Sequence, residues 1–256
     1  MDNRKLGRLP PRFDPRTLRA ARYLIPSALP PLPSYVRWSH NATQPWGMML
    51  NDRLGDCTCA SVGHAIQAWT ANHGQEVTLP DSDILAAYEA VSGYDPTTGA
   101  NDNGAVEIDV LNYWRNSGVG GHKIGAYVSL EPRDQREIQE GIYLFGGVYI
   151  GISLPLAWQN QSTWKAPKFR FDFGHRAWQP GSWGGHAVFV VDYDAQHATC
   201  VSWGELVQIE WAAFPLYVEE AYGIIAPEWV NDVTKAPNGF DMPSLVQDLQ
   251  VLGQPG

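Results

Sequence analysis

Residues 51–61 read NDRLGDCTCAS, where a loop passes into the start of a helix. Asp56 is of a type favoured at helix N-caps, and the helical pattern after it continues to Gly74, a residue type that ends many helices. The apolar positions of this segment recur at helical spacing: Val62, Ala65, Ile66 and Trp69. This periodicity predicts a helix from about residue 56 with one face buried.

The two cysteines of this stretch occupy different faces of the expected helix. Cys57 follows Asp56 directly, so its sulfur should face outward from the first turn, where the helix dipole favours a thiolate. Cys59 lies about 200° further around and should point into the core. Cys57 is therefore a candidate nucleophile and Cys59 a packing residue, although free cysteines are often only buried apolar residues. A metal site of Cys57, Cys59 and His64 is disfavoured because the two thiols diverge.

The rest of the chain divides into helices followed by strands. Helices are expected at about residues 81–92, 105–117 and 134–146, and strands at 148–154, 186–193 and 198–203, with GVGGHKIGAYVSL (118–130) starting the sheet. This order indicates an α+β fold of two lobes, in which a helical lobe packs against an antiparallel sheet lobe. A loop rich in Trp and Gly, residues 155–185, should border the cleft.

Three regions differ in composition. Residues 1–34 contain seven prolines and are expected to form an extended, basic N-terminal arm. Residues 35–230 should form the folded domain, with a helical part at about 51–120 and a sheet part at about 121–230. Residues 231–256 remain as a C-terminal tail.

Charge is distributed unevenly along the chain. The first 37 residues carry eight Lys or Arg against two Asp, whereas the whole chain has a net charge of −9. An acidic domain repels phosphates, which disfavours nucleic acid as a partner. The arm is expected either to remain solvated or to dock on an acidic surface, including that of a protein partner or a second copy of the chain.

Cysteine content and hydropathy indicate the compartment. Three cysteines do not make a disulfide framework, and no segment reaches the apolar length of a membrane span. MDNRKLGRLPPRFDP, at the start of the chain, lacks the apolar run of a signal peptide. We therefore expect a soluble protein of a reducing compartment such as the cytoplasm, with no membrane partner.

A thiolate nucleophile needs a residue that takes and returns its proton, most often histidine. His64 lies seven residues after Cys57 on the same helix, roughly 10 Å away, and cannot reach it. His186 opens the apolar strand HAVFVVDY directly after WGG, where a side chain is accessible and held by a rigid element. His186 is the better candidate, although a histidine taken alone is more often structural.

These residues resemble the papain-like cysteine peptidases. In that family a glutamine lies six residues before the nucleophilic cysteine, and a histidine begins a later strand. Here Asn51 lies six residues before Cys57, GGHAVFVVDYD (184–194) is similar to the histidine strand, and CVSWG (200–204) is similar to the last element. DCTCA also fits the Asp-Cys-x-x-Ala pattern of the related bacteriocin-leader peptidases. The resemblance covers about residues 35–225 and points to the divergent papain-like proteins of bacteriophages and some bacteria.

The resemblance implies a role for each site residue. Cys57 would be the nucleophile and His186 its base, with Trp203 packed near the imidazole. Asn51 is one methylene shorter than the family's glutamine, and its amide would donate to the oxyanion. The family needs no cofactor, so none is expected.

The third catalytic position departs from the family. The asparagine or aspartate that orients the histidine falls at Val201, which cannot accept a hydrogen bond. Asp192 is six residues along the strand from His186, about 20 Å away, and cannot substitute. Ser202 can take this position only if the strand shifts by one residue. Otherwise the site is a Cys-His dyad.

Two classes of function remain open. The first is a cysteine hydrolase that cuts peptide or isopeptide bonds in a peptide or protein substrate, and retention of Cys57 and His186 favours it. The second is a non-catalytic structural or binding protein on the same fold, for example a virion component docked by its arm, and Val201 favours it. A peptidoglycan amidase or endopeptidase is a further alternative, weakened because no wall-binding module is recognisable.

Overall fold

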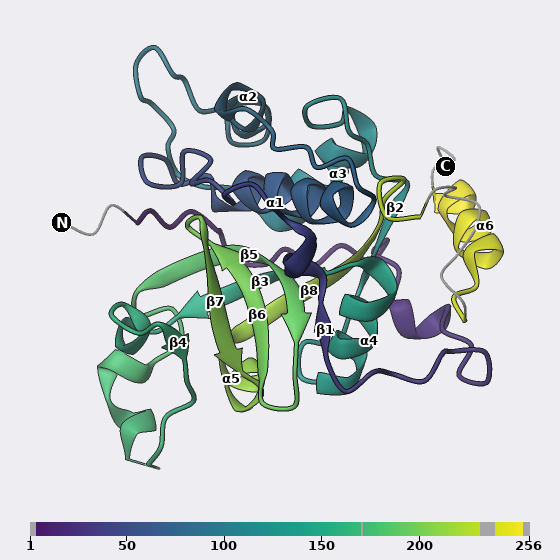
Figure 1. Cartoon of the computed structure of the whole chain (residues 1–256). Coiled ribbons are helices and arrows are strands. Elements are labelled where there is room, and N and C mark those ends of the chain that lie inside the picture. The colour runs from purple at the N-terminus through teal and green to yellow at the C-terminus, as the bar shows by residue number, and fades with distance from the viewer. Residues whose placement is uncertain (1–3, 170, 231–238, 253–256) are drawn as a thin grey trace.

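The computed structural model shows helices stacked on one large sheet (Figure 1). It describes residues 4–169, 171–230 and 239–252. The α-helices are α1 (Cys57–Asn72), α2 (Asp81–Ser92), α3 (Glu107–Asn116), α4 (Gln135–Phe145), α5 (Phe214–Tyr217) and α6 (Met242–Leu252). The strands are β1 (Val36–Arg37), β2 (Ala126–Ser129), β3 (Val148–Leu154), β4 (Thr163–Trp164), β5 (Gly184–Tyr193), β6 (His197–Ser202), β7 (Glu205–Glu210) and β8 (Val218–Ile225).

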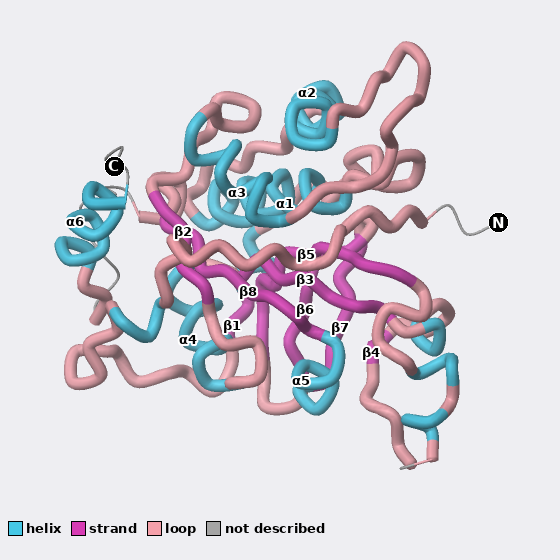
Figure 2. Tube along the Cα trace, turned by 180° about the vertical axis from the view of Figure 1, so that it is seen from behind, coloured by secondary structure: helices cyan, strands magenta, loops and turns pink. Residues whose placement is uncertain are grey.

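Helix α1 lies at the centre of the molecule. The sequence predicts one buried face, but every residue from Cys57 to Ala71 is buried. The reason is that α2 and α3 cover one side of α1 while β5 covers the other, so that small residues such as Gly63 and Ala68 are enclosed as well. Both views show this helical layer lying over the sheet (Figures 1 and 2).

The strands form a single sheet in the order β2-β8-β3-β5-β6-β7-β4, with β1 pairing on β5. All neighbours are antiparallel except β4 and β7, which run parallel. The central position of β5 places its N-terminal end beside the start of α1. This arrangement brings residues from the two halves of the chain together.

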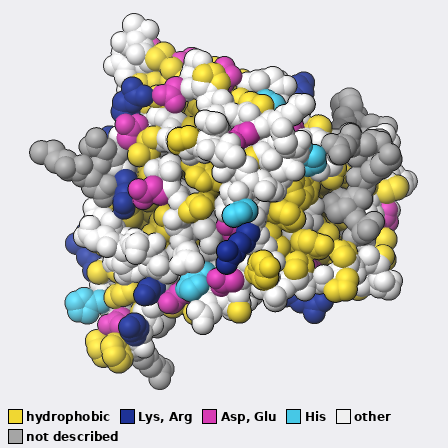
Figure 3. Space-filling view, viewed as in Figure 1, with side chains coloured by type: hydrophobic (Ala, Val, Ile, Leu, Met, Phe, Trp, Pro, Cys, Tyr) yellow, Lys and Arg dark blue, Asp and Glu magenta, His cyan; other side chains and the backbone are white. Residues whose placement is uncertain are grey.

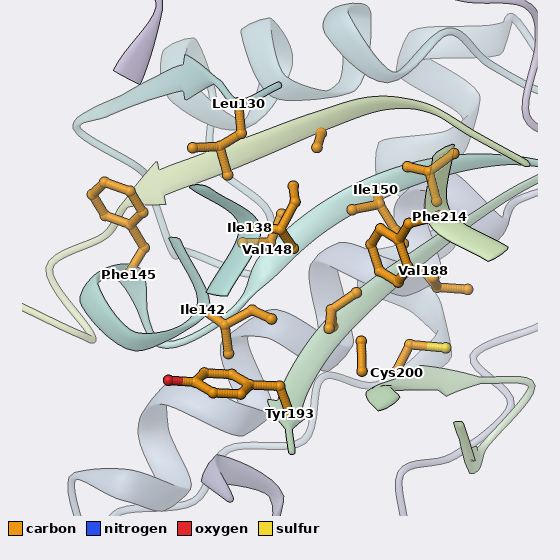
Figure 4. Packing of buried hydrophobic residues seen from close by; sticks show 14 of the residues in the cluster. Leu130, Ile138, Ile142, Phe145, Val148, Ile150, Val188, Tyr193, Cys200 and Phe214 are labelled. Carbon is orange, nitrogen blue, oxygen red and sulfur yellow. The ribbon is translucent and has the colours of Figure 1, made fainter. Parts of the chain in front are cut away.

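Alternate residues of β5 enter two different cores. Ala187, Phe189 and Val191 pack in the core that contains α1. Val188 and Val190 pack in the second core, on the other face of the sheet. Figure 4 shows Val188 there, near Ile150 and Phe214. The period of two that defines a strand therefore decides which side of the sheet each site residue faces.

Most of the expected elements are present. The expected α+β fold is confirmed, and the helices near 81–92 and 134–146 and the strand at 148–154 agree closely with α2, α4 and β3. The last two strands, β7 and β8, and the helix α6 were not predicted. Within the described residues, no helix combines the length and apolarity that crossing a bilayer requires.

The N-terminal arm lies along its own chain. Its one helical element among the described residues is a 3-10 turn at Ala20–Arg22. Ala20 and Tyr23 are buried in the core of the sheet lobe, where Tyr23 contacts Phe240 just before α6. The sequence places the folded domain at residues 35–230, but these two residues of the arm belong to its core as well, because the region of Phe240 and α6 supplies an apolar surface for them.

The loop between β3 and β5 extends away from the domain. Near its tip the rings of Phe169 and Phe171 stack with centroids 5.3 Å apart and are 58% and 71% exposed. Figure 3 shows hydrophobic side chains at this tip, at the lower left of the molecule. Closer to the sheet, the same loop contributes β4, which brings Trp164 toward the candidate site.

Candidate active site

Cys57 is the first residue of α1 and faces the start of β5. Its Sγ accepts a hydrogen bond from the backbone N–H of Ala187 at 3.4 Å. The thiol was expected to face outward, but Cys57 is only 1% exposed. Asp56 occupies the N-cap position as expected, yet its carboxyl group makes no capping hydrogen bond.

Burial controls the protonation state of Cys57. Desolvation raises the pKa of its thiol to about 12, although the backbone amides of Ala187 and Gly7 favour the thiolate. Asp56 is also buried, and burial raises the pKa of its carboxyl group to about 8. In this conformation Cys57 is therefore a neutral thiol at neutral pH.

The imidazole of His186 is held between aromatic rings and a hydroxyl group. It stacks on Trp203 with centroids 4.1 Å apart and an interplanar angle of 11°, and Trp164 lies edge-on at 6.5 Å. Its Nε2 is 2.9 Å from Ser202 Oγ, whereas its buried Nδ1 has no hydrogen-bond partner. Burial lowers the pKa of His186 to about 3. The ring is thus neutral and oriented, with one nitrogen free.

Sheet register explains why Ser202 contacts the histidine. Val201 pairs with Phe189 across β5 and β6, so both side chains lie on the side of α1. His186 is an odd number of residues from Phe189, and Ser202 is next to Val201, so His186 and Ser202 share the other face of the sheet. His186 lies near the N-terminal end of β5, and the next residue, Ala187, donates its N–H to Cys57. Asp192 is engaged elsewhere, since its carboxylate accepts hydrogen bonds from the backbone and hydroxyl of Ser39.

Asn51 lies near the start of α1 but is engaged. Its Nδ2 donates to the backbone carbonyl of Leu54 at 3.1 Å and to Asp56 Oδ1 at 3.2 Å. Both amide hydrogens are therefore occupied, and the oxyanion role of Asn51 stays a prediction.

Cys59 and His64 lie deeper in the helical lobe. Cys59 is fully buried, and burial raises the pKa of its thiol well above the ordinary value. His64 Nε2 lies 3.1 Å from the carbonyl oxygen of Gly47. Among the described residues, no group of three or more His, Cys, Asp or Glu is arranged to hold a metal ion.

Residues 4–9 of the arm lie across the site and bind both lobes through backbone atoms. The Lys5 N–H donates to Asn51 O at 3.0 Å, and the Arg8 N–H donates to Gly185 O at 3.2 Å. Ala105 donates to Gly7 O at 2.8 Å and accepts from the Leu9 N–H at 3.0 Å. Further along, Trp203 Nε1 donates to Lys5 O at 3.0 Å. Sequence reasoning did not place the arm here.

Glycines make room for this segment. A Cβ atom on Gly7 would lie 1.7 Å from Gly55 O, and one on Gly104 would lie 1.9 Å from Gly7 O. A Cβ on Gly185 would lie 2.2 Å from Arg8 O. These glycines, spread through the sequence, are the signal from which the close approach of two backbones could have been inferred.

A cavity of about 580 Å³ opens beside Ser202 and Trp203, two residues that contact His186. Its lining includes Arg4 of the arm, Ser202 and Trp203 of the site, and residues 159–162 of the loop between β3 and β5. The loop expected to border the cleft thus contacts this cavity.

No protein-family model and no curated protein matches the chain, whereas solved structures do. Xylellain, a cysteine protease from Xylella fastidiosa, is 17% identical, with a TM-score of 0.66 over 88% of this chain and 97% of its own. The Carica candamarcensis cysteine protease CMS1MS2 is 18% identical, with a TM-score of 0.53 over 75% and 98%. Digestive procathepsin L 3 of Tenebrio molitor is 14% identical, with a TM-score of 0.56 over 87% and 76%.

At these identities the likeness concerns the fold. The chain has the papain-like α+β fold, which confirms the resemblance drawn from its sequence. The three structures are cysteine proteases and say nothing of a phage or virion role, which stays a prediction. Roles of individual residues in this chain have to be argued from its own geometry.

Proposed function

We propose that this protein is a cysteine peptidase with Cys57 as the nucleophile and His186 as the general base. One observation carries the proposal. The Cys57 sulfur accepts a hydrogen bond from the amide of Ala187, the residue directly after His186, and the buried Nδ1 of His186 has no hydrogen-bond partner, Cys57 included. Ser202 engages the other ring nitrogen, which leaves Nδ1 as the atom available to the thiol.

The reaction follows from these positions. Nδ1 of His186 removes the proton from Cys57 Sγ, and the thiolate attacks the substrate carbonyl carbon. The backbone N–H of Cys57, at the start of α1, stabilises the oxyanion, and Asn51 adds a second donor once its amide leaves Asp56. His186 then returns the proton to the leaving amine. Water, activated by the same nitrogen, hydrolyses the thioester and frees the enzyme.

Residues 4–9 must leave the cleft before a substrate can enter. The backbone N–H of Gly7 lies beside the sulfur, so residues 4–9 occupy the space that a substrate would take. When the segment leaves, water returns to the site and the pKa values of Cys57 and His186 move back toward their ordinary values. A thiolate-imidazolium pair becomes accessible only in this open form.

Covalent labelling tests the proposal. The full chain is treated with an epoxide warhead at neutral pH, and the modified cysteine is mapped by mass spectrometry. We expect modification at Cys57 and none at Cys59 or Cys200, both fully buried. Cys59→Ser should label normally, whereas His186→Ala should reduce labelling of Cys57 strongly. Labelling of Cys59 in preference to Cys57 would show that the assignment is wrong.

Turnover provides the second test. In a chain opened by Gly7→Val, peptide cleavage should fall by at least about a thousandfold on Cys57→Ser. Equal cleavage by the Cys57→Ser chain would exclude Cys57 as the nucleophile.

The alternative is a non-catalytic binding protein on the same fold. It is favoured by the neutral, covered thiol and by the engagement of both amide hydrogens of Asn51. It predicts that opening the cleft leaves Cys57 no more reactive than an ordinary exposed cysteine.

A further inference from the structure

The side chain of Arg8 enters a buried pocket next to the candidate active site. The pocket is formed by Glu107 at the start of α3, by Glu219 and Glu220 of β8, and by Gly151 of β3. The guanidinium group is 1% exposed, so the pocket encloses it almost completely.

Every nitrogen of this guanidinium group has an acidic partner. Arg8 Nε and Nη2 donate to Glu220 Oε1 at 2.9 and 2.7 Å, and Nη1 donates to Glu219 Oε2 at 2.7 Å. The hydroxyl of Tyr222 donates to the second oxygen of Glu220 at 2.9 Å and fixes that carboxylate. Acceptors at all three nitrogens suit the planar guanidinium group better than the single ammonium of lysine.

Glu107 is the independent sign that the pocket is built for a cation. It is fully buried, neither of its carboxylate oxygens has a hydrogen-bond partner, and Oε1 lies 3.6 Å from Arg8 Nε. Three carboxyl groups thus surround one positive charge. Burial raises the pKa of Glu107 well above its ordinary value, whereas the charge of Arg8 opposes that shift. A buried carboxyl group without a hydrogen-bond partner is favoured by a cation in the space beside it.

The floor of the pocket fits an arginine side chain closely. A Cβ atom on Gly151 would lie 2.2 Å from Arg8 Nε and 2.7 Å from Glu107 Oε1. Any larger residue at position 151 would therefore fill the space of the guanidinium group. The absence of a side chain here leaves room for the ligand's side chain.

Apart from the position of Gly7, where Gly55 leaves no room for a Cβ atom, the cleft around this pocket contacts the peptide mainly through backbone atoms. Ala105 and Gly185 bind the arm through backbone atoms, which every peptide has. Gly7 lies beside the thiol, and Arg8 is the next residue. A peptide bound in the same way, with glycine at the position of Gly7, would place its next side chain in the acidic pocket. This pocket would then select that side chain.

On the basis of the proposed peptidase function, we infer that the pocket of Glu107, Glu219 and Glu220 is the specificity pocket. The substrate is then a peptide in which arginine is adjacent to the residue that lies beside the Cys57 thiol. The arm then occupies the site with the chain's own arginine. A substrate gains access by exchanging its arginine for Arg8.

The test uses the full chain opened by Gly7→Val. The acidic pocket stays unmutated, and only the peptide is varied. Matched fluorogenic peptides carry arginine, lysine, leucine or citrulline on either side of a fixed central glycine. Citrulline has nearly the shape of arginine without its charge. We expect kcat/KM for arginine to exceed that for citrulline by at least about 30-fold, with lysine between them. Equal rates for arginine and citrulline would overturn the inference.

Variants locate the selection in this pocket. Glu220→Gln should reduce the arginine preference about tenfold or more, whereas Glu140→Gln, a carboxyl group on α4 that pairs with Arg136, should leave it unchanged. Arg8→Ala, which empties the pocket without altering Gly7, serves as a second way to open it and should show the same preference. A preference that survives Glu220→Gln would place the selection elsewhere.

A binding measurement separates this inference from the proposed function. In the Cys57→Ala, Gly7→Val chain, calorimetry compares a KLGRLP peptide, the sequence of residues 5–10, with its citrulline analogue. Selective binding of the arginine form without cleavage in the Cys57-containing chain would support the pocket and exclude the peptidase. Cleavage without arginine preference would support the peptidase and exclude the pocket. Equal binding of the two peptides would exclude the pocket by itself.

Discussion

Two stretches of the same arm are held by different forces. Residues 4–9 bind the cleft through backbone hydrogen bonds and the ion pairs of Arg8. Residues 18–25 are held mainly by burial, with Ala20 and Tyr23 in the core of the sheet lobe. Pro10 and Pro11 separate the two stretches.

The difference indicates which stretch can leave. Backbone hydrogen bonds in a cleft are replaced by bonds to water or to another peptide, so each contributes only about 0.5–1.5 kcal/mol net. A buried aromatic side chain has no such replacement, and its exposure costs about 1.5–3 kcal/mol from the apolar surface alone. Residues 4–9 are therefore exchangeable, whereas residues 18–25 anchor the arm to the fold.

The largest expected effect is that of Tyr23→Ala on stability. The ring is 1% exposed and contacts Phe240, and its hydroxyl donates to Asp248 at 2.7 Å. Its loss should lower the free energy of unfolding by about 3–5 kcal/mol, a fall in Tm of about 10 °C by thermal denaturation. Phe13→Ala, at an 86% exposed position of the same arm, should change stability by less than about 0.5 kcal/mol. Similar losses in both variants would contradict the division of the arm.

The second effect is that of Gly7→Val on the reactivity of Cys57. The valine Cβ would collide with Gly55 O and expel residues 4–9, while the anchor at Tyr23 remains. We expect epoxide labelling of Cys57 to accelerate about 30- to 100-fold, equivalent to about 2–2.7 kcal/mol. The Tm should fall as well, because Arg8 leaves the buried carboxyl groups of Glu107 and Glu220 without a cation.

Gly174→Val is the matched control, because a Cβ there meets no atom within 4 Å. It should label at the wild-type rate. If the Gly7→Val chain labels no faster than the wild-type chain, residues 4–9 do not cover the Cys57 thiol in solution.

Much of the fold could be predicted from local signals. The helix at 81–92 and the strand at 148–154 each show their own periodicity, and each is followed by a glycine or a proline. Strand β8 was missed because YVEEAYGII places two glutamates inside an apolar run. The cation that makes Glu220 acceptable there is Arg8, 212 residues earlier, and no local pattern connects them.

The candidate site divides in the same way. Cys57 begins α1 and His186 lies near the start of β5, and both elements have strong signals of their own, so these two residues could be singled out from the sequence; their catalytic roles stay a prediction. The contact of Ser202 with His186 depends on the register of β5 against β6, which a single strand does not reveal. The arm was not placed in the cleft because its bonds there use backbone atoms, which leave no side-chain pattern.

The third effect concerns Asp56 and the way in which the free energy of unfolding depends on pH. The folded pKa of Asp56, about 8, lies above its ordinary value of 3.8. The folded state therefore holds a proton that the unfolded state releases between these values, and this contribution is full below about pH 4 and lost as the pH rises through 8. The free energy of unfolding should fall by up to about 1.4 kcal/mol per pH unit from this group in that window.

Urea denaturation between pH 5 and 7.5 measures this slope. Asp56→Asn should flatten it, whereas Asp52→Asn, in the preceding loop, should not. Gly7→Val should reduce it partly, because water admitted by the displaced arm lowers the pKa of Asp56 toward its ordinary value. An unchanged slope in Asp56→Asn would mean that Asp56 is ionised in the folded chain.

The smallest effect is expected at Ser202, which positions the histidine. In the Gly7→Val chain, Ser202→Ala should lower kcat for peptide cleavage about 3- to 10-fold with KM and Tm nearly unchanged, because one neutral hydrogen bond to Nε2 is lost. Ser202→Thr keeps the hydroxyl group and should recover most of the rate. Val201→Asn restores the family's residue type but puts it on the side of α1, packed with Phe189, so it should destabilise the chain without raising kcat. A rate gain from Val201→Asn would mean that β6 shifts its register in the open form, and that Ser202 occupies the third position only while residues 4–9 cover the site.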